Sequence, residues 1–254
     1  MKILSRKKVR LLSLRHYVIV LIVSFAFLSC ENDDDAPEGI EFFQILSIGD
    51  SRVEGHQTDF VSYRYELWKL LKNEGKGVDF FGNRIDERVY PSFQEIPFDS
   101  NHEGKSGDRI DEALQRVDSL VINNPEMVGN LVLLGIGGND LVEGVSVDNS
   151  MQYLNSIIDK LQEANDSVNI FIEQIAPGTA NFQEINGMDQ SEYLAFNNAI
   201  SDIAIAKTTS QSRVIAVDMS TVLTDEDYAD DVHYNQSGTQ KIANQYFEAM
   251  QFLF

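Results

Sequence analysis

Short apolar runs alternate with longer amphipathic stretches along most of this chain, and this alternation restricts the fold more than any other feature. The apolar runs occupy 42–48, 78–81, 131–136, 168–175 and 213–217. Between and after them, apolar residues recur at helical spacing in 61–71, 106–121, 151–161, 191–206 and a last segment that Ser237 is expected to cap. Short apolar runs of this kind are typical of strands that are buried on both faces.

Strands that alternate with helices predict a parallel sheet with helices on both faces. We therefore expect 42–254 to form one α/β domain, a three-layer α/β/α sandwich around a five-stranded parallel sheet. An irregular stretch of roughly 25 residues follows the second predicted strand, and long loops of this kind are often functional. Ligands of such sheets bind at the carboxyl ends of the strands. Trp68, on the first predicted helix, is expected to lie in the core.

The first thirty residues have the pattern of an export signal. Residues 1–16 carry six Lys and Arg residues and no acid, and the twelve residues 17–28 carry no charge. This apolar run is too short to span a bilayer comfortably and suits a signal peptide. It ends in FLSC, which resembles the lipobox of bacterial lipoproteins, with Cys30 as the lipidated residue. An ordinary secretory signal with a chance cysteine is the alternative.

We accordingly expect a signal peptide at 1–29, a lipid anchor on Cys30 that attaches the chain to a membrane, and an acidic linker at 30–41. The expected location is the outer membrane or the surface of a bacterium. Whether the lipid anchor faces the periplasm or the medium stays open, and so does any role of the linker as an export address.

Composition excludes several classes of partner. The net charge is −20, which argues against nucleic acid and against anionic lipid surfaces as partners. Cys30 is the single cysteine, so an internal disulfide framework and a zinc site built from several cysteines are excluded. The oligomeric state cannot be read from the sequence.

Unusual polar residues fall at the ends of the predicted strands. Gly49 allows a sharp turn after the first strand, which would leave Ser51 at the mouth of the sheet. A serine hydroxyl is a poor nucleophile unless a base lies within hydrogen-bond reach. Asp230 precedes His233 by three residues, so the carboxylate can hold one ring nitrogen while the other faces Ser51.

Four short motifs resemble those of the SGNH, or GDSL-type, serine hydrolases. They are GDS at 49–51, SG at 106–107, GGND at 137–140 and DDVH at 230–233. The resemblance covers nearly all of 42–254 and implies a flavodoxin-like SGNH hydrolase fold and a serine esterase.

Position by position, the resemblance assigns catalytic roles to three segments. Ser51 matches the nucleophile, His233 the general base and Asp230 the acid that orients the base. The backbone N–H groups of Ser51 and Gly107 and the side-chain amide of Asn139 match the oxyanion hole. Asp227 and Asp231 are the alternatives to Asp230.

Three longer segments, SYRYELWKLL, VDFFGN and FDSNHEGKSGDRID, resemble the acetyl-xylan-esterase-like carbohydrate esterases. This closer resemblance implies an O-acyl ester of a carbohydrate, with O-acetyl as the expected group, cleaved through an acyl-enzyme. The chain departs from the usual pattern at Arg52, at Asp108 and at Tyr234, which stand where Ile, an aromatic residue and Pro are common. These departures are expected to change the substrate pocket, and Arg52, His102 and Tyr234 are the residues expected to line it.

Other roles remain open for several of these residues. His102 and Glu103 can instead brace the Gly107 loop, Tyr234 can stack on a sugar or simply pack, and His56 can lie at the mouth of the site or on a solvated loop. The acidic run 225–231 lacks the central glycine of an EF-hand calcium loop.

GIGGND lacks the third glycine of a dinucleotide fingerprint, and we expect no metal and no organic cofactor. Two other functions remain as alternatives. One is a lysophospholipase or thioesterase of the same mechanism, and the other is a non-catalytic glycan-binding surface lipoprotein.

Overall fold

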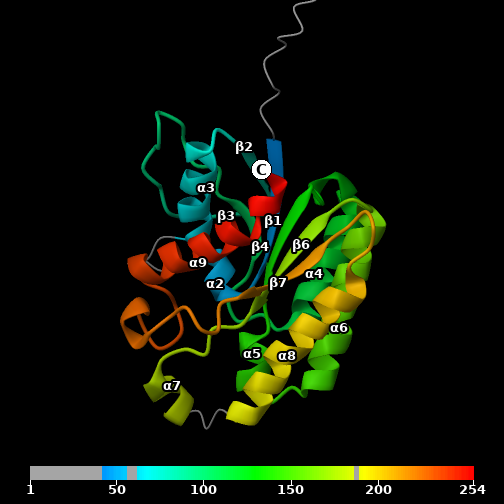
Figure 1. Cartoon of the computed structure of the whole chain (residues 1–254), viewed down its shortest axis with the longest axis vertical. Coiled ribbons are helices and arrows are strands. Elements are labelled where there is room, and N and C mark those ends of the chain that lie inside the picture. Colours follow the sequence, from blue (N-terminus) through cyan, green and yellow to red (C-terminus); the bar gives the residue numbers. More distant parts are fainter. Residues whose placement is uncertain (1–41, 56–61, 186–188) are drawn as a thin grey trace, which may run out of the picture. The chain divides into compact units, whose positions relative to one another are not determined.

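The computed structural model describes residues 42–55, 62–185 and 189–254, which belong to one compact unit (Figure 1). The expected signal peptide at 1–29, the whole of the expected linker at 30–41 with Cys30, and His56 lie outside the described residues. Among the helices that the structure describes, none has both the length and the apolar composition needed to cross a membrane.

The described sheet has seven strands in the order β3-β4-β1-β5-β6-β7, with β2 paired to β1. The strands are β1 (Phe42–Gly49), β2 (Gly77–Phe81), β3 (Arg84–Ile85), β4 (Asn101–Gly104), β5 (Leu131–Gly135), β6 (Asn169–Gln174) and β7 (Val214–Asp218). All pairs are parallel except β3 with β4. The predicted α/β fold with a mostly parallel sheet is confirmed.

The expected number of strands needs a correction. The five predicted strands correspond to β1, β2, β5, β6 and β7, and the stretch expected to be irregular contains β3 and β4 as well. These two strands have only two and four residues, which is too short for any periodicity to show in the sequence.

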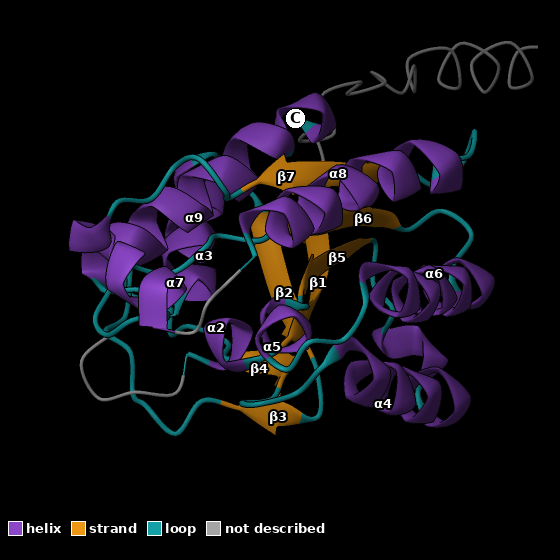
Figure 2. Ribbon diagram, turned by 90° about the horizontal axis from the view of Figure 1, so that it is seen from below, coloured by secondary structure: helices purple, strands orange, loops and turns teal. Residues whose placement is uncertain are grey.

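Helices cover both faces of this sheet, as Figure 2 shows. Their bounds are α2 (Ser51–Glu54), α3 (Tyr63–Asn73), α4 (Ile110–Asn123), α5 (Gly138–Val142), α6 (Val147–Ala164), α7 (Ala180–Ile185), α8 (Gln190–Lys207) and α9 (Gln236–Ala249). Short 3₁₀ turns follow at Pro125–Met127, Asp225–Asp227 and Gln251–Leu253. Side chains of α4, α6 and α8 pack on one face of the sheet, and those of α3 and α9 pack on the other.

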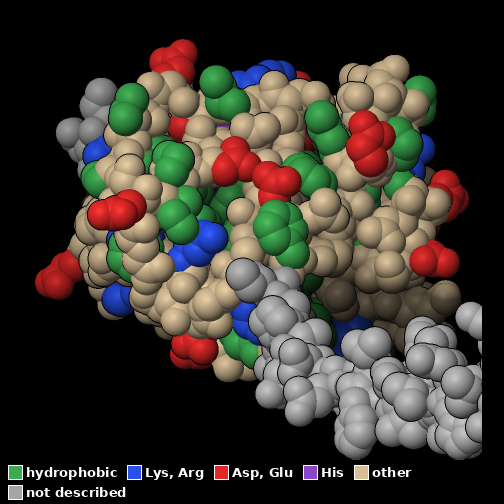
Figure 3. Space-filling view, turned by 90° about the horizontal axis from the view of Figure 1, so that it is seen from above, with side chains coloured by type: hydrophobic (Ala, Val, Ile, Leu, Met, Phe, Trp, Pro, Cys, Tyr) green, Lys and Arg blue, Asp and Glu red, His purple; other side chains and the backbone are tan. Residues whose placement is uncertain are grey.

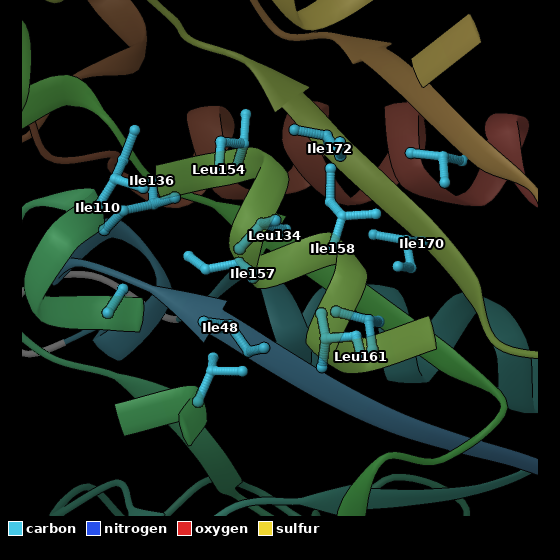
Figure 4. Close-up of a cluster of buried hydrophobic side chains, with 14 of the residues drawn as sticks. Ile48, Ile110, Leu134, Ile136, Leu154, Ile157, Ile158, Leu161, Ile170 and Ile172 are labelled. Carbon is cyan, nitrogen blue, oxygen red and sulfur yellow. The ribbon is translucent and has the colours of Figure 1, made fainter. Parts of the chain in front are cut away.

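Successive side chains along each strand point to opposite faces of the sheet, and this divides the hydrophobic core into two clusters. In β5, Val132 and Leu134 belong to the cluster under α6, whereas Leu131 and Leu133 face α3 and α9. Figure 4 shows Ile157, Ile158 and Leu161 of α6 directed toward the isoleucines and leucines of the strands. Trp68 is 2% exposed in the second cluster, so its predicted place in the core is confirmed.

Two predicted helix ends are corrected. The helix expected from Ser106 begins at Ile110, because Gly107 has a φ of 83° that a helix does not permit. Ser237 does not cap the last helix: Asn235 does, and its side chain accepts hydrogen bonds from the amides of Ser237 and Gly238.

Three strands end level with one another at the centre of the sheet. Gly49 at the end of β1 is in register with Gly104 of β4 on one side and with Gly135 of β5 on the other. A Cβ atom on Gly49 would lie 2.1 Å from the carbonyl oxygen of Gly135, so only glycine fits there. The GDS, SG and GGND motifs therefore leave the sheet side by side.

Figure 2 looks onto this end of the sheet. Figure 3 shows the opposite end, where Asp and Glu side chains are dispersed over the face rather than gathered in one patch.

Candidate active site

Ser51 is the first residue of the short helix α2, directly beyond the central strand. Asp50 caps this helix, and its Oδ1 atom accepts a hydrogen bond from the Arg52 amide at 2.9 Å. The helix ends at Glu54, and Gly55, whose φ is 69°, caps it. This tight strand-to-helix turn presents the Ser51 hydroxyl at the carboxyl end of the sheet.

His233 and Asp230 reach Ser51 from the segment between β7 and α9. The Nε2 atom of His233 lies 2.8 Å from the Oγ atom of Ser51, and its Nδ1 atom lies 2.8 Å from Oδ2 of Asp230. The other carboxylate oxygen of Asp230 accepts hydrogen bonds from the amides of Val232 and His233, at 2.8 and 2.7 Å.

Partial burial acts to raise the pKa of the Asp230 carboxyl, but these hydrogen bonds and the His233 ring outweigh it and hold that pKa below its usual value. Asp230 is thus a carboxylate at neutral pH.

The two acids that competed with Asp230 in the sequence have other partners. Asp227 accepts hydrogen bonds from Thr224 and Ser237 and pairs with Lys241, which holds the loop before α9 in place. Asp231 accepts a hydrogen bond from the Thr179 hydroxyl at 3.1 Å. Among the three, only Asp230 is bonded to the His233 ring in the described residues.

Asn139 lies beside the nucleophile and is bonded to the residue that follows Gly107. The Asn139 side-chain amide donates to the carbonyl oxygen of Asp108 at 2.8 Å, and Asn139 lines the same cavity as Ser51. Arg116 and Lys105 form ion pairs with the Asp108 carboxylate and so hold the Gly107 turn. The structure thus brings Ser51, His233, Asp230 and Asn139 together, with the Gly107 turn bonded to Asn139 through Asp108.

A cavity of about 170 Å³ opens next to Ser51. Its walls come from the segments after β1, β5 and β6, from α7 and α8, and from the loop before His233. The lining is largely apolar and comprises Leu141, Val142, Ile175, Ala176, Pro177, Phe182, Tyr193 and Val232, with Asp50, Ser51, Arg52, Gly138 and Asn139.

Two of the three expected substrate-lining residues need correction. His102 is 1% exposed, and its ring accepts a hydrogen bond from the Gly104 amide and faces Asp86 at 3.2 Å. It therefore braces the loop after β4, the alternative role considered above, and does not face a substrate. Tyr234 is 2% exposed in the core and offers no surface for stacking on a sugar. Arg52 does line the cavity.

Two buried carboxyl groups beneath the site were not singled out from the sequence. Asp50 is buried, and burial raises the pKa of its carboxyl. Glu173 of β6 is 4% exposed and accepts a hydrogen bond from the Tyr246 hydroxyl at 2.7 Å; burial raises its pKa to about 7. The signal for Glu173 in the sequence was a charged residue inside the apolar strand FIEQI.

The described part of the chain contains no group of three or more His, Cys, Asp and Glu side chains arranged to hold a metal ion. The site joins a hydroxyl, an imidazole and a carboxylate through hydrogen bonds. An amide donor lies to one side of them and an apolar cavity lies next to them.

The family model described as GDSL-like Lipase/Acylhydrolase matches residues 47–241, which is most of the chain and includes every motif of the site. The chain belongs to this family. The resemblance to the GDSL-type hydrolases drawn from four short motifs is thereby confirmed.

A multidomain esterase of Ruminococcus flavefaciens is 26% identical over 226 residues, which are 82% of this chain and 28% of that protein. The chain thus spans little more than a quarter of the length of that curated relative.

Solved structures of carbohydrate esterases have the same fold. A carbohydrate esterase of family 3 from Talaromyces cellulolyticus superposes with a TM-score of 0.69 at 24% identity, over 84% of this chain and 97% of the other. A family 3 carbohydrate esterase from Clostridium thermocellum gives a TM-score of 0.66 at 25% identity, with the same coverage. Structures described as family 3 carbohydrate esterases are thus among those that this chain is similar to.

Proposed function

We propose that this protein is a serine esterase that removes O-acyl groups, with O-acetyl as the expected group, from carbohydrate. The observation that carries the proposal is the chain of two 2.8 Å contacts from Ser51 through His233 to Asp230. This is the arrangement that activates a serine hydroxyl, because the imidazole accepts its proton while the carboxylate fixes the tautomer of the ring.

In the proposed reaction, the Oγ atom of Ser51 attacks the ester carbonyl carbon and its proton passes to Nε2 of His233. The negative charge that develops on the carbonyl oxygen is stabilised by the N–H groups of Ser51 and Gly107 and by the Asn139 amide. His233 then gives its proton to the oxygen of the leaving sugar, so the C–O bond breaks and an acyl-enzyme remains. Water attacks this ester with His233 again as the base, which releases the carboxylic acid and restores Ser51.

The cavity beside Ser51 supports a short acyl group over a long one. Its volume of about 170 Å³ is close to that of an engineered protein cavity that holds benzene. A lysophospholipid or a long-chain thioester needs an apolar channel for its chain, which this volume does not offer. A sugar ring is polar and is expected to stay on the open side of the site.

Acetate release from a panel of acetylated glycans, together with an acyl-length series of p-nitrophenyl esters, tests the proposal. We expect the highest kcat/KM for acetyl and other short esters and none for Ser51→Ala. A preference for long acyl chains would favour the lysophospholipase or thioesterase alternative. Glycan binding without turnover, and without reaction of Ser51 with an organophosphonate, would favour a non-catalytic glycan-binding protein.

We also propose that the protein is an exported lipoprotein, anchored in a bacterial membrane through Cys30 and facing a glycan. The support is the basic segment, the uncharged run 17–28 and FLSC in the sequence. Labelling of cells with a radioactive fatty acid tests this, with Cys30→Ser as the variant that should take up no label and leave the membrane fraction. A labelled Cys30→Ser chain would contradict the proposal.

A further inference from the structure

Arg52, the residue after the nucleophile, connects two loops that follow other strands. Its Nε atom donates to the carbonyl oxygen of Val232 at 3.0 Å, and its Nη1 atom donates to the carbonyl oxygen of Ala176 at 2.8 Å. Val232 directly precedes His233, and Ala176 lies two residues beyond the end of β6. One guanidinium group therefore joins the nucleophile helix, the end of β6 and the His233 loop.

The same side chain also contacts the residue on the other side of His233. The Cζ atom of Arg52 lies 5.2 Å from the centre of the Tyr234 ring, within the range of a cation–π contact. Tyr234 is buried and thus fixed in place. Arg52 consequently holds His233 through both of its chain neighbours, by the carbonyl group before it and the aromatic ring after it.

The charge of Arg52 is maintained although the group is partly buried. Burial acts to lower the pKa of the guanidinium, but the tyrosines Tyr234 and Tyr228 and the carboxyl groups of Asp50 and Glu173 raise it above its usual value. The permanent cation and its planar set of donors suit two carbonyl oxygens and one ring at once. A lysine ammonium on a flexible stem does not reproduce that geometry.

We propose that Arg52 is a positioning residue that sets the distance between Ser51 and His233 by holding the backbone of Val232 and the ring of Tyr234. The inference rests on the proposed function, since it concerns the serine–histidine contact of that reaction. It goes beyond the expectation drawn from the sequence, in which Arg52 lines the substrate site, because Arg52 lines the cavity and also holds the His233 loop. Two of its five N–H donors are directed to backbone carbonyls of the protein, one of them in the residue before His233, and these bonds are the basis of the positioning role.

The two roles predict different kinetics, which Arg52→Lys and Arg52→Ala can separate. A misplacement of a reacting group by about 1 Å can cost a factor of roughly 10² in rate, so we expect kcat to fall by about that factor in Arg52→Ala and by less in Arg52→Lys. KM should stay within about twofold. The same factor should apply to every ester tested and to the rate at which a small organophosphonate, which reacts at the Ser51 hydroxyl, labels the enzyme.

Arg213→Ala is the matched control. The Arg213 guanidinium also lies over an aromatic ring, 4.5 Å from the centre of Phe252, but at the start of β7 and so at the opposite end of the sheet. Its removal should leave kcat and the labelling rate unchanged. Circular dichroism and thermal unfolding of each variant verify the fold, and Arg52→Lys, which keeps the charge and most of the stem, provides the answer if Arg52→Ala does not fold.

A rise in KM with an unchanged kcat, or a loss that differs from one ester to another while labelling of Ser51 stays at the wild-type rate, would overturn the positioning role. Wild-type kinetics in both Arg52 variants would overturn it as well. If Ser51→Ala retains turnover, the proposed function itself fails. If Ser51→Ala is inactive and the Arg52 variants behave as wild type, only the inference about Arg52 fails.

Discussion

The Nε2 atom of His233 lies 2.8 Å from the Oγ atom of Ser51, although 182 positions separate the two residues in the chain. Ser51 follows the central strand β1, and His233 lies just before α9. The stacked rings of Tyr63 on α3 and Tyr246 on α9, with centres 5.3 Å apart, fix α9 on the face of the sheet that also carries α3. The contact between hydroxyl and imidazole is therefore a product of how α9 packs.

Replacing Ser51 by Ala should remove the esterase activity and keep the fold. The nucleophile and its base act as a unit, so a loss of kcat on the order of 10⁴ to 10⁶ is expected. The measurement is the burst and steady-state release of p-nitrophenol from p-nitrophenyl acetate. Ser156→Ala, on the exposed side of α6, is the control and should keep the wild-type burst. A burst that survives in Ser51→Ala would rule out the acyl-enzyme.

Replacing Asp230 by Asn should lower kcat strongly, while the same change at Asp231 should not. An amide at position 230 cannot fix the tautomer of His233 that accepts the Ser51 proton, and a loss approaching 10⁴-fold is the comparable effect in a serine triad. Asp231→Asn affects a contact with the Thr179 hydroxyl, outside the serine–histidine contact. Steady-state kinetics of the two variants side by side decide between them, and equal losses would contradict the role given to Asp230.

Asn139→Ala should lower kcat and kcat/KM by the same factor. The Asn139 amide is expected to bond the oxyanion in the transition state more strongly than the ester carbonyl in the ground state, and loss of one such donor costs about 3 kcal/mol, or roughly 10²-fold. Initial rates over a range of ester concentrations give both constants. An effect confined to KM would instead make Asn139 a residue for substrate binding.

Glu173→Gln should change how stability depends on pH. Burial raises the pKa of Glu173 from 4.5 to about 7, so the folded protein holds this proton more tightly than the unfolded chain does. Stability is therefore lost as pH rises from about 4.5 to about 7, and at pH 8 the cost is on the order of 3 kcal/mol.

Glutamine carries no charge and can still accept the hydrogen bond from Tyr246. Urea unfolding at pH 5 and pH 8 should show the variant gaining stability over the wild type only at the higher pH. A difference between the two proteins that is the same at both pH values would refute the burial effect.

Gly138→Ala should narrow the cavity beside Ser51 without straining the backbone. A Cβ atom at Gly138 would lie 3.9 Å from Oδ2 of Asp50 and 4.0 Å from Cγ2 of Ile175, which are ordinary contact distances. One methyl group in such a pocket is worth about 1–3 kcal/mol of discrimination, or roughly tenfold or more. We expect the kcat/KM for p-nitrophenyl butanoate to fall relative to that for the acetate. An unchanged ratio would show that the acyl group does not enter this cavity.

The local patterns of the sequence were sufficient for the main strands and helices. Buried strands such as β1 and β5 need unbroken apolar runs, and amphipathic helices such as α6 need apolar residues at helical spacing, so both leave a pattern in the residues themselves. The sequence could not reveal β3 and β4, because strands of two and four residues have no period to detect. Ser237 was misplaced as a cap because Asn235, two residues earlier, makes the capping bonds instead.

The identity of the site residues followed from short motifs, while the placement of several neighbours required the structure. Burial separated His102 and Tyr234 from the substrate side, and no local pattern distinguishes a buried histidine or tyrosine in a loop from an exposed one. The contacts of Arg52 with Val232 and Ala176 join positions that are 180 and 124 apart in the chain, so they depend on where three strands end.

The sequence by itself determined the class of fold and the order in which the polar motifs leave the strands, because both depend on the chemistry of neighbouring residues. Only the tertiary structure decided which of three nearby aspartates faces the imidazole, how large the cavity beside the hydroxyl is, and that the arginine next to the nucleophile holds the histidine loop. Those properties arise from distances between segments that are remote in the chain, and such distances are set by packing and burial rather than by any local preference.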